Sequence, residues 1–414
     1  MGFLRTFYKN SKVSGDRLMS SVLALKGGQP VRKTMLRYAT QSVDEADRRA
    51  VDEVLRSEWL TTGPAVVHFE KALCDYTGSK HAVVVNTGTA ALHAATWAAG
   101  IQAGDEVIVP AISFVASANC ILYQGGNPVF ADLCPDTLNI DPADVERKIT
   151  PKTRAIIAVD FAGHPCDHAS LKALADRHHI PVIEDAAHSL GATYEARRVG
   201  TLQRLSTLSF HPVKHITTGE GGAILTDDDK LAKAMCSFRH HGIDLDLHVR
   251  GLRNSWEYDV ITLGFNYRIP DINCALGISQ LSKLDAWLIR RRSIVERYRG
   301  ALGSLPMIQV PEERPGCTSA WHLYVIRLNQ ETLTASRAEV FAALRAENIG
   351  VNVHYIPIPW MTHYVKIGYR RGQWPVAERE YERIMSLPLY PTMADRDVED
   401  VVAALNKVWN AYRR

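Results

Sequence analysis

No stretch of this 414-residue sequence approaches the roughly 18 consecutive apolar residues that a membrane-spanning helix requires. The amino terminus lacks the long apolar core of a secretory signal peptide. The seven cysteines are scattered, odd in number and without a C-x-x-C pair, which is typical of reduced cytosolic thiols rather than of disulfides or zinc ligands. We therefore expect a cytoplasmic protein that has no membrane partner.

A strong charge of either sign is also missing. Lysine and arginine total 48 against 45 for aspartate and glutamate, so the formal net charge is only +3, and no basic stripe carries interleaved aromatic residues. The basic run from Arg290 to Arg299 is typical of a solvated helix face. No G-x-G-x-x-G motif follows an apolar run, which argues against a nicotinamide oxidoreductase. The sequence therefore predicts no nucleic-acid partner.

From Gly78 to about Asp229, short apolar runs alternate with helical stretches such as Thr89–Gly100 and His168–His179. The runs are rich in Val and Ile and are bounded by Gly, Pro and Asp, which is typical of buried strands. They cover residues 82–86, 106–110, 128–132, 155–161, 181–185, 206–210 and 222–226. This order predicts an α/β fold with a parallel or mixed sheet covered by helices on both faces. Such sheets bind ligands where their strands end.

The flanking regions are organised differently. Residues 1–36 are polar and basic without a clear period, so we expect a mobile extension. A helix is predicted over Ser42–Glu58, with Ser42 and Glu45 forming a capping box, and one long helix over residues 270–298. A smaller unit follows, with expected strands over 321–328 and 350–357 and expected helices over 337–349 and 395–412. We divide the chain into an extension (1–36), a large unit (37–285) and a small unit (286–414).

Two residues at predicted strand ends suggest chemistry. Asp185 ends one buried strand, and Lys214 follows after one more strand. Singly, the aspartate is equally consistent with a helix N-cap, and most lysines lie in solvent. Together at one sheet edge, an acid that holds a pyridine nitrogen and a lysine that forms a Schiff base are the minimum for pyridoxal 5′-phosphate (PLP) chemistry.

A phosphate site is suggested by the turn VVNTGTAAL, residues 84–92, which joins a strand to a helix start. The backbone amides of Gly88, Thr89 and Ala90 would face outward, and the helix dipole favours an anion there. Ser209 adds a hydroxyl on the loop that carries Lys214. A lone Thr-Gly turn is common, so this signal is weak by itself.

The run HPCDH offers His164, Cys166 and His168 as alternative metal ligands. Its spacing matches no common zinc motif, so no metal is expected.

Seven motifs in order carry a family resemblance: NTGTAALHAA, DEVIVPAISFVASANC, FADLCPDTLNIDP, VIEDAAHSLGA, SFHPVKHITTGEGG, RHHGI and LGFNYRIPDINCALGISQL. They resemble the DegT/StrS sugar aminotransferases, which are PLP-dependent enzymes of fold type I acting on nucleotide-linked keto-sugars. The resemblance runs from about Arg37 to the carboxyl terminus. It implies a large domain with a mostly parallel sheet sandwiched by helices, a smaller α+β carboxyl-terminal domain, and a homodimer with a shared active site.

The resemblance also implies residue roles. Lys214 matches the lysine that forms the Schiff base, and Asp185 matches the partner of the pyridine nitrogen. His188 matches the residue that lies against the phenolic oxygen of the cofactor. The other matches are a ring that stacks on the cofactor, three phosphate ligands, and an asparagine that reaches the phosphate across the dimer interface: Phe114; Gly88, Thr89 and Ser209; and Asn266. Without the resemblance, Phe114 would be taken as a core residue and Asn266 as a turn residue.

The implied reaction moves an amino group from L-glutamate to a keto-sugar. Family members with histidine in place of Lys214 catalyse deoxygenation, so the lysine favours amino transfer. The motifs SEWLTTGP, NVHYIPI and ERIMSLPLYP resemble enzymes of the pseudaminic-acid route, which aminate a UDP-linked 4-keto-6-deoxy N-acetylhexosamine. The expected substrate residues are His211, Arg268, His354 and Tyr355, of which the last two are equally consistent with plain strand residues.

Other readings remain open. LALKGGQPVRK, residues 23–33, resembles instead the opening of enzymes that aminate inosose or antibiotic sugars. The alternative acceptors are therefore a dTDP- or GDP-linked 4-keto-6-deoxysugar, a 3-keto sugar or an inosose. A non-catalytic PLP-binding regulator is the alternative from another class, although residues 1–36 are too few and too irregular for a helix-turn-helix.

Overall fold

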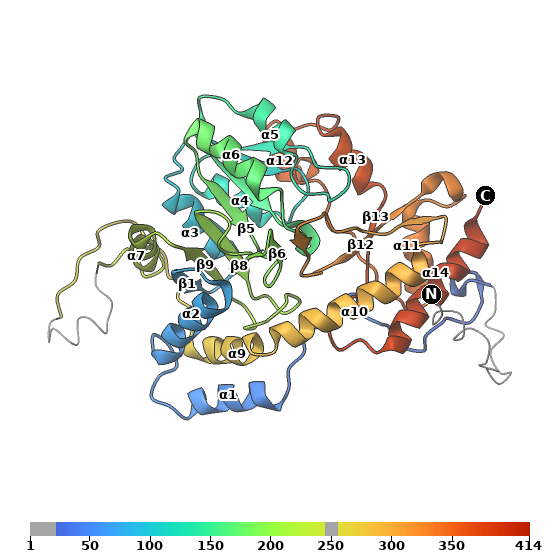
Figure 1. Ribbon diagram of the computed structural model, residues 1–414, viewed down its shortest axis with the longest axis horizontal. Helices are drawn as coiled ribbons and strands as arrows, with labels where there is room; N and C mark the ends of the chain where they lie inside the picture. The colour runs from blue at the N-terminus through green and yellow to red at the C-terminus, as the bar shows by residue number, and fades with distance from the viewer. Residues whose placement is uncertain (1–21, 245–255) are drawn as a thin grey trace, which may run out of the picture.

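The computed structural model describes residues 22–244 and 256–414, and its centre is a seven-stranded mixed sheet (Figure 1). The strand order is β1-β9-β8-β5-β4-β2-β3, with β9 antiparallel to both of its neighbours and the other pairs parallel. The strands are β1 (His81–Val85), β2 (Glu106–Pro110), β3 (Asn127–Ala131), β4 (Thr153–Val159), β5 (Val182–Asp185), β8 (Leu205–Ser209) and β9 (Gly222–Thr226). All seven predicted strands, and the α/β fold, are confirmed.

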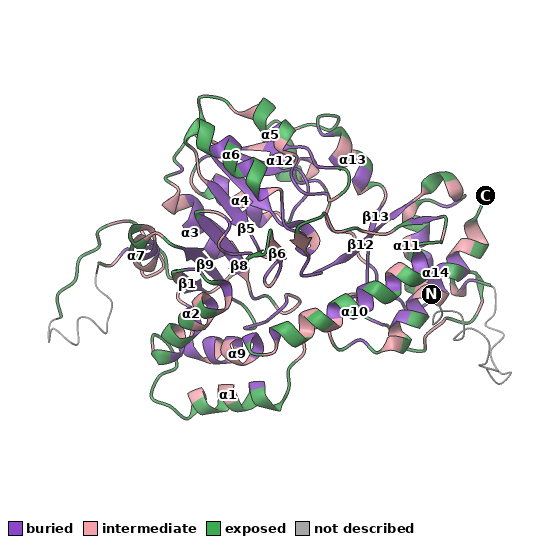
Figure 2. Cartoon of the chain, in the orientation of Figure 1, coloured by how far each residue is buried: buried purple, intermediate pink, exposed green. Residues whose placement is uncertain are grey.

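Helices cover both faces of this sheet. One face carries α3 (Gly88–Ala98), α4 (Ala116–Tyr123) and α7 (Asp229–Phe238), and the other carries α2 (Pro64–Thr77), α5 (Pro142–Lys148) and α6 (His168–His178). Alternate residues of a strand serve opposite faces: Val83 of β1 packs in the first layer and Val84 in the second. Figure 2 shows the buried strands between helices whose outer sides are exposed. Burial on both faces explains why the strands are nearly continuous apolar runs.

A second core surrounds a small antiparallel sheet of β10 (Ile308–Gln309), β12 (Tyr324–Leu328) and β13 (Ile384–Leu387). The helices packed there are α10 (Leu284–Leu302), α11 (Arg337–Ala346) and α14 (Asp395–Tyr412). By contrast, α12 (Thr362–Lys366) and α13 (Pro375–Tyr381) pack with α3 and α4 on the large sheet. A second small sheet is formed by β6 (Thr193–Tyr194), β7 (Arg197–Arg198) and β11 (Cys317–Thr318). We propose that the chain divides near residue 285. The start of α10, at Leu284, packs with α2 on the large sheet, whereas its later residues Ile294 and Tyr298 pack in the second core.

Two helix predictions are wrong in detail. The helix α1 (Glu45–Leu55) is capped by Asp44, not by Ser42. The Asp44 carboxylate accepts the Asp47 amide at 3.1 Å, and the Asp47 carboxylate accepts the Asp44 amide at 3.0 Å. The single helix predicted over 270–298 is two, α9 (Asp271–Leu281) and α10. The break redirects the chain, because α9 packs against α1 and α2 whereas α10 crosses to the second core.

The strand predicted over residues 350–357 is also wrong. Only Asn352 pairs there, exchanging backbone hydrogen bonds of 3.2 and 2.8 Å with Ser386 of β13. Beyond Asn352 the chain leaves the small sheet and runs toward the large one, where the Ile358 amide donates to the carbonyl of Ala111 at 2.8 Å. This departure carries His354 and Tyr355 to the edge of the large sheet.

Residues 22–36 pack on the small unit, so the predicted mobile extension is wrong for them; the residues before them lie outside the described part. The buried Glu347 carboxylate accepts the amides of Ala24 and Val31, each at 2.8 Å, and pairs with Lys407 at 2.7 Å. A carboxylate without water gains most from charged and N–H partners, which fixes this segment firmly.

Three expectations from composition can be compared with the structure. The seven cysteines, all within the described residues, are free thiols as expected. No helix in residues 22–244 and 256–414 is long and apolar enough to cross a membrane. The predicted solvated face over Arg290–Arg299 is wrong at Arg291, which is buried and donates to the carbonyls of Trp321 and Leu389 at 3.1 Å. This part of α10 faces the second core.

Candidate active site

Three strands that run in the same direction deliver side chains to one edge of the large sheet. The carboxyl ends of β1, β8 and β5 lie together, and β9 enters between β1 and β8 with its amino end at this edge. Gly222 of β9 is therefore paired with both β1 and Ser209. Asp185 ends β5, and Lys214 lies in the loop between β8 and β9. Gly88 lies just beyond β1, so Gly88, Asp185, Ser209 and Lys214 lie at this edge.

Asp185 is a buried carboxylate, 4% exposed. Its Oδ2 accepts a hydrogen bond from the Ser117 hydroxyl at 2.7 Å, and its Oδ1 accepts the Ala187 amide at 3.2 Å. Burial raises the pKa of Asp185, which these hydrogen bonds and the charge of Lys214 oppose. Such a group is stabilised by a cationic N–H placed beside it, and a protonated pyridine nitrogen supplies one.

Lys214 is a partly buried amine whose charge is poorly solvated. Burial lowers its pKa to about 8, while the negative charge of Asp185 acts in the opposite direction. Its backbone amide donates to the His211 carbonyl at 2.9 Å, which closes the turn that presents the side chain. A neutral amine is the nucleophilic form, and near neutral pH this lysine reaches it far more readily than a solvated one.

His188 and two residues of the small unit meet at the same edge. The His188 Nε2 atom lies 3.2 Å from the Tyr355 hydroxyl, and its Nδ1 has no hydrogen-bond partner among the described residues. Burial, followed by the charge of Lys214, holds the pKa of His188 well below its ordinary value, so the ring is neutral. His354 Nδ1 lies 2.8 Å from the Ser386 hydroxyl, and burial lowers its pKa to about 4. Both rings therefore face the lysine uncharged.

A junction that only glycine fits lies between β1, β8 and β9. A Cβ added to Gly88 would lie 2.8 Å from the Cβ of Ser209, and one added to Gly222 would lie 2.6 Å from the carbonyl oxygen of Thr87. Thr87 caps α3 by accepting the Ala90 amide at 3.0 Å. The result is a helix N-terminus with a hydroxyl beside it, and with Thr89 on the first turn. This arrangement suits a phosphate group.

The remaining candidates lie on the open side of this edge. Phe114 is 54% exposed with its ring centroid 6.1 Å from that of Tyr355, so it is not a core residue. His211 and Asn266 are exposed, and the Arg268 Nη1 lies 2.7 Å from a ring nitrogen of His240. In the described part of the chain, no hydrogen bond or ring contact joins Asn266 or Arg268 to the groups around Lys214.

The sequence patterns missed several side chains at this edge. Ser117 anchors Asp185, and the ring of Tyr38 packs 5.4 Å from that of His354. The rings of His215 and His322 lie 5.5 Å apart. A single serine, tyrosine or histidine has no pattern of its own, so these positions emerge only from the fold.

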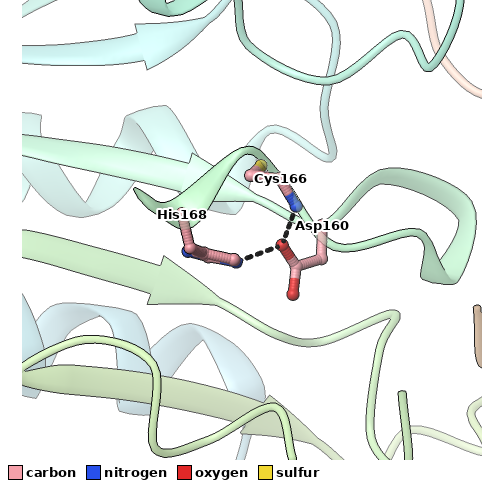
Figure 3. Close-up of side chains that lie close together, drawn as sticks. All are labelled: Asp160, Cys166 and His168. Atoms are coloured by element: carbon pink, nitrogen blue, oxygen red, sulfur yellow. Dashed lines mark hydrogen bonds and ion pairs between the residues drawn. The ribbon is translucent and has the colours of Figure 1, made fainter. Parts of the chain in front are cut away.

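A hydrogen-bonded charge network lies behind Asp185. Asp160 Oδ1 accepts hydrogen bonds from His168 Nε2 at 2.9 Å and from the Cys166 amide at 2.8 Å (Figure 3). Glu184 Oε1 lies 3.5 Å from the same His168 nitrogen. Ligand atoms of Asp160, Cys166 and His168 lie within 4.8 Å of one another, but the Asp160 oxygen already accepts two N–H groups. His164 of the HPCDH run points elsewhere, with Nδ1 2.8 Å from the Pro165 carbonyl.

This network fixes the turn that carries His188. Ser189 donates to Asp160 Oδ2 at 2.7 Å. Burial raises the pKa of Glu184 to about 7, which favours its neutral form. Burial alone would lower the pKa of His168, but the charge and hydrogen bond of Asp160 outweigh it and raise the pKa, so this ring is the cation of the network.

The profile of the DegT/DnrJ/EryC1/StrS aminotransferase family matches residues 41–406. The chain belongs to this family. It is 40% identical over 380 residues to the spore coat polysaccharide biosynthesis protein SpsC of Bacillus subtilis, an alignment that covers 91% of this chain and 98% of SpsC.

Two solved structures are similar over nearly their whole length. PseC of Helicobacter pylori, an aminotransferase involved in the biosynthesis of pseudoaminic acid, has a TM-score of 0.85 at 32% identity, covering 91% of this chain and 100% of PseC. Spr1654 of Streptococcus pneumoniae in its PMP-form has a TM-score of 0.86 at 31% identity, covering 91% and 99%, and a PLP-form is also solved. The fold type I prediction is confirmed, and the chain is a member of a family of sugar aminotransferases.

The residues at the edge suit PLP on their own geometry. Asp185 is a buried carboxylate that a neighbouring cation would stabilise, and Lys214 is an amine with a lowered pKa. The backbone junction at Gly88 and Ser209 leaves a helix N-terminus that suits a phosphate. These three features match the ring nitrogen, the aldehyde and the phosphate of one molecule.

We expect Glu184→Gln to flatten the pH dependence of stability. The folded-state pKa of Glu184, about 7, exceeds the ordinary value of 4.5, so the folded protein keeps a proton that the unfolded chain releases. Stability therefore falls as pH rises through this window, by about 1.4 kcal/mol per unit of pKa shift. Urea unfolding at about pH 5 and about pH 7 measures the difference. Glu146→Gln, at an exposed position of α5, should leave the slope unchanged; an unchanged slope in Glu184→Gln would contradict the buried network.

Gly88→Ala is expected to weaken the binding of added PLP at least about tenfold, a loss of about 1.4 kcal/mol. The new Cβ would force Ser209 away from the helix N-terminus. Gly300→Ala on α10 is the control, because its Cβ meets nothing within 4 Å and alanine favours the helix. Titration with PLP, followed by absorbance, measures both. Equal affinity in Gly88→Ala and wild type would show that the junction does not hold the phosphate.

Proposed function

We propose that this protein is a PLP-dependent aminotransferase that moves an amino group from L-glutamate to C4 of a UDP-linked 4-keto-6-deoxy N-acetylhexosamine. The single observation that carries the amino transfer is Lys214, with its pKa of about 8, beside the buried acid Asp185. The acceptor is supported by the likeness to PseC over 91% of the chain and by the motifs SEWLTTGP and NVHYIPI. A nucleotide-linked sugar also agrees with the likeness to SpsC, which is named for polysaccharide biosynthesis.

PLP, when bound, supplies an electron-withdrawing ring that stabilises negative charge on the α-carbon of the amino donor. Asp185 would keep the ring nitrogen of the bound cofactor protonated, because a buried carboxylate favours a cation beside it. Ser117 holds the carboxylate in place. Lys214 would take the proton from the α-carbon of the amino donor and would deliver it to C4′ of the cofactor. An amine with a pKa of about 8 is well matched to give and take that proton near neutral pH.

Other groups bind and orient. Gly88, Thr89 and Ser209 would hold the phosphate at the start of α3. His188 would present a neutral ring to the phenolic oxygen, and Phe114 would cover the open face of the ring. The substrate side is assigned to four residues around this edge: His211, Arg268, His354 and Tyr355.

We also propose that two copies form a homodimer with shared active sites. Beside Asn266, large apolar side chains are exposed, with Trp256 at 84% and Leu263 at 81%. Apolar side chains gathered this densely on one segment are typical of an interface. In a dimer, Asn266 on this segment would reach the phosphate held by the partner.

Lys214→Ala is expected to abolish the response to L-glutamate. Wild type loaded with PLP should show a visible absorption band that disappears when L-glutamate is added, with one 2-oxoglutarate formed per site. The variant lacks the base, so its half-reaction should slow by at least about 10²-fold. Lys71→Ala, an exposed lysine of α2, should behave as wild type. A wild type without a visible band would contradict the proposal.

Once the half-reaction is established, the acceptor can be identified by supplying keto-sugars to the aminated form. The UDP-linked 4-keto-6-deoxy N-acetylhexosamine should restore the visible band fastest. Faster recovery with a dTDP- or GDP-linked sugar, a 3-keto sugar or an inosose would change the acceptor but keep the reaction. Tight PLP binding without turnover of any amino donor would favour the alternative that the protein is a non-catalytic PLP-binding regulator.

Leu263→Glu is expected to shift the protein from dimer to monomer in light scattering, because a charge would be buried against the partner. PLP affinity should fall with it, since the partner's phosphate contact is lost. Ile289→Glu, at an equally apolar exposed position on α10, should remain dimeric. A monomeric wild type with full PLP affinity would refute the shared site.

A further inference from the structure

Three buried imidazoles from three different segments lie close together near Lys214. His188 lies in the turn after β5, and His215 is adjacent to Lys214. His322 lies two residues before β12 of the small unit. The ring centroid of His322 lies 4.4 Å from that of His188 and 5.5 Å from that of His215. The His322 ring therefore lies close to one ring from the turn after β5 and to one ring from the loop that carries Lys214.

The backbone around His322 is fixed from both sides. The Ala320 amide donates to the Gly163 carbonyl at 2.9 Å, and His215 Nε2 donates to the Ala320 carbonyl at 3.0 Å. A Cβ on Gly163 would lie only 2.7 Å from the Trp321 nitrogen, so the two segments touch backbone to backbone. On the other side, the buried Arg291 donates to the Trp321 carbonyl at 3.1 Å. The ring of His322 thus has little freedom to move away.

The His322 ring is uncharged and packs against the rings of His188 and His215. Burial, followed by the charge of Lys214, holds the pKa of His322 well below its ordinary value. Its Nδ1 atom, like that of His188, has no hydrogen-bond partner among the described residues. What the side chain supplies is therefore the volume of the ring, which separates and supports its two neighbours. Deleting it would leave a polar-lined space that water can enter.

We infer that His322 is a positioning residue for amino transfer, whose ring sets the spacing between the turn that carries His188 and the loop that carries Lys214. The inference rests on the proposed function, since it concerns the chemistry of Lys214. Because the spacing depends on ring volume, phenylalanine should substitute for histidine and alanine should not.

The test compares His322→Ala and His322→Phe with wild type and Tyr324→Ala. Tyr324 is a matched control, because it is a buried aromatic two residues further on that stacks on Tyr298 at 4.9 Å in the second core. The first readout is the pH profile of Lys214 acetylation in cofactor-free protein, followed by peptide mass spectrometry. The second is the half-reaction with L-glutamate in PLP-loaded protein.

In His322→Ala, water should reach Lys214 and move the acetylation midpoint up by about half a pH unit or more. The half-reaction should slow at least about tenfold with KM for L-glutamate within about twofold, because the reacting groups are misplaced rather than the donor lost. His322→Phe should recover both values, and Tyr324→Ala should lose stability but keep them.

Several outcomes would overturn the inference. These are an unchanged profile in His322→Ala, a His322→Phe that behaves like the alanine variant, or an equal shift in Tyr324→Ala. The acetylation profile does not require PLP. If the wild type failed to react with L-glutamate while the profile still shifted in His322→Ala, the proposed function would fall and the role of the His322 ring in spacing the two loops would stand.

Discussion

The site depends on a carboxylate that the fold has placed where water cannot solvate it. Asp185 ends β5 beneath α4, and two hydrogen bonds from Ser117 and Ala187 only partly replace the lost hydration. A cation placed beside this buried carboxylate would therefore stabilise it, and the other groups of the site lie around the position that such a cation would take. Behind it, the Asp160–His168–Glu184 network holds the strand end and the following turn, so the carboxylate cannot relax toward solvent.

Charge on the other side of this edge is concentrated in a single group. His188, His215, His322 and His354 all have lowered pKa values because they are buried, and Lys214 raises the cost of protonating each of them. The lysine is thus surrounded by imidazoles that stay neutral. In the proposed reaction, a proton that leaves the donor would therefore be accepted by Lys214 and not by these histidines, whose lowered pKa values make them weaker bases.

The elements that depend on local residue patterns could be predicted from the sequence. Most of the seven strands were predictable because burial on both faces makes them nearly continuous apolar runs. Asp185 and Lys214 were conspicuous as polar groups beside such runs. The break between α9 and α10 was not, since Ser282 and Lys283 are compatible with a helix and only the crossing between cores interrupts it. Asn352–Pro357 reads as a strand, but contacts with the large sheet draw it away. Ser117 and His322 act through residues distant in the chain, which no local pattern records.

The extended segment after Asn352 has an evolutionary consequence. The cofactor side of the edge is built from backbone that tolerates only glycine at Gly88 and Gly222, so it is closed to change. The segment with His354 and Tyr355 has a single bridging pair in the small sheet, at Asn352, and its side chains can vary without breaking a ladder. Under the proposed function, selection for a new acceptor can act on this segment, so that relatives can keep the amino-transfer chemistry while differing in the sugar they accept.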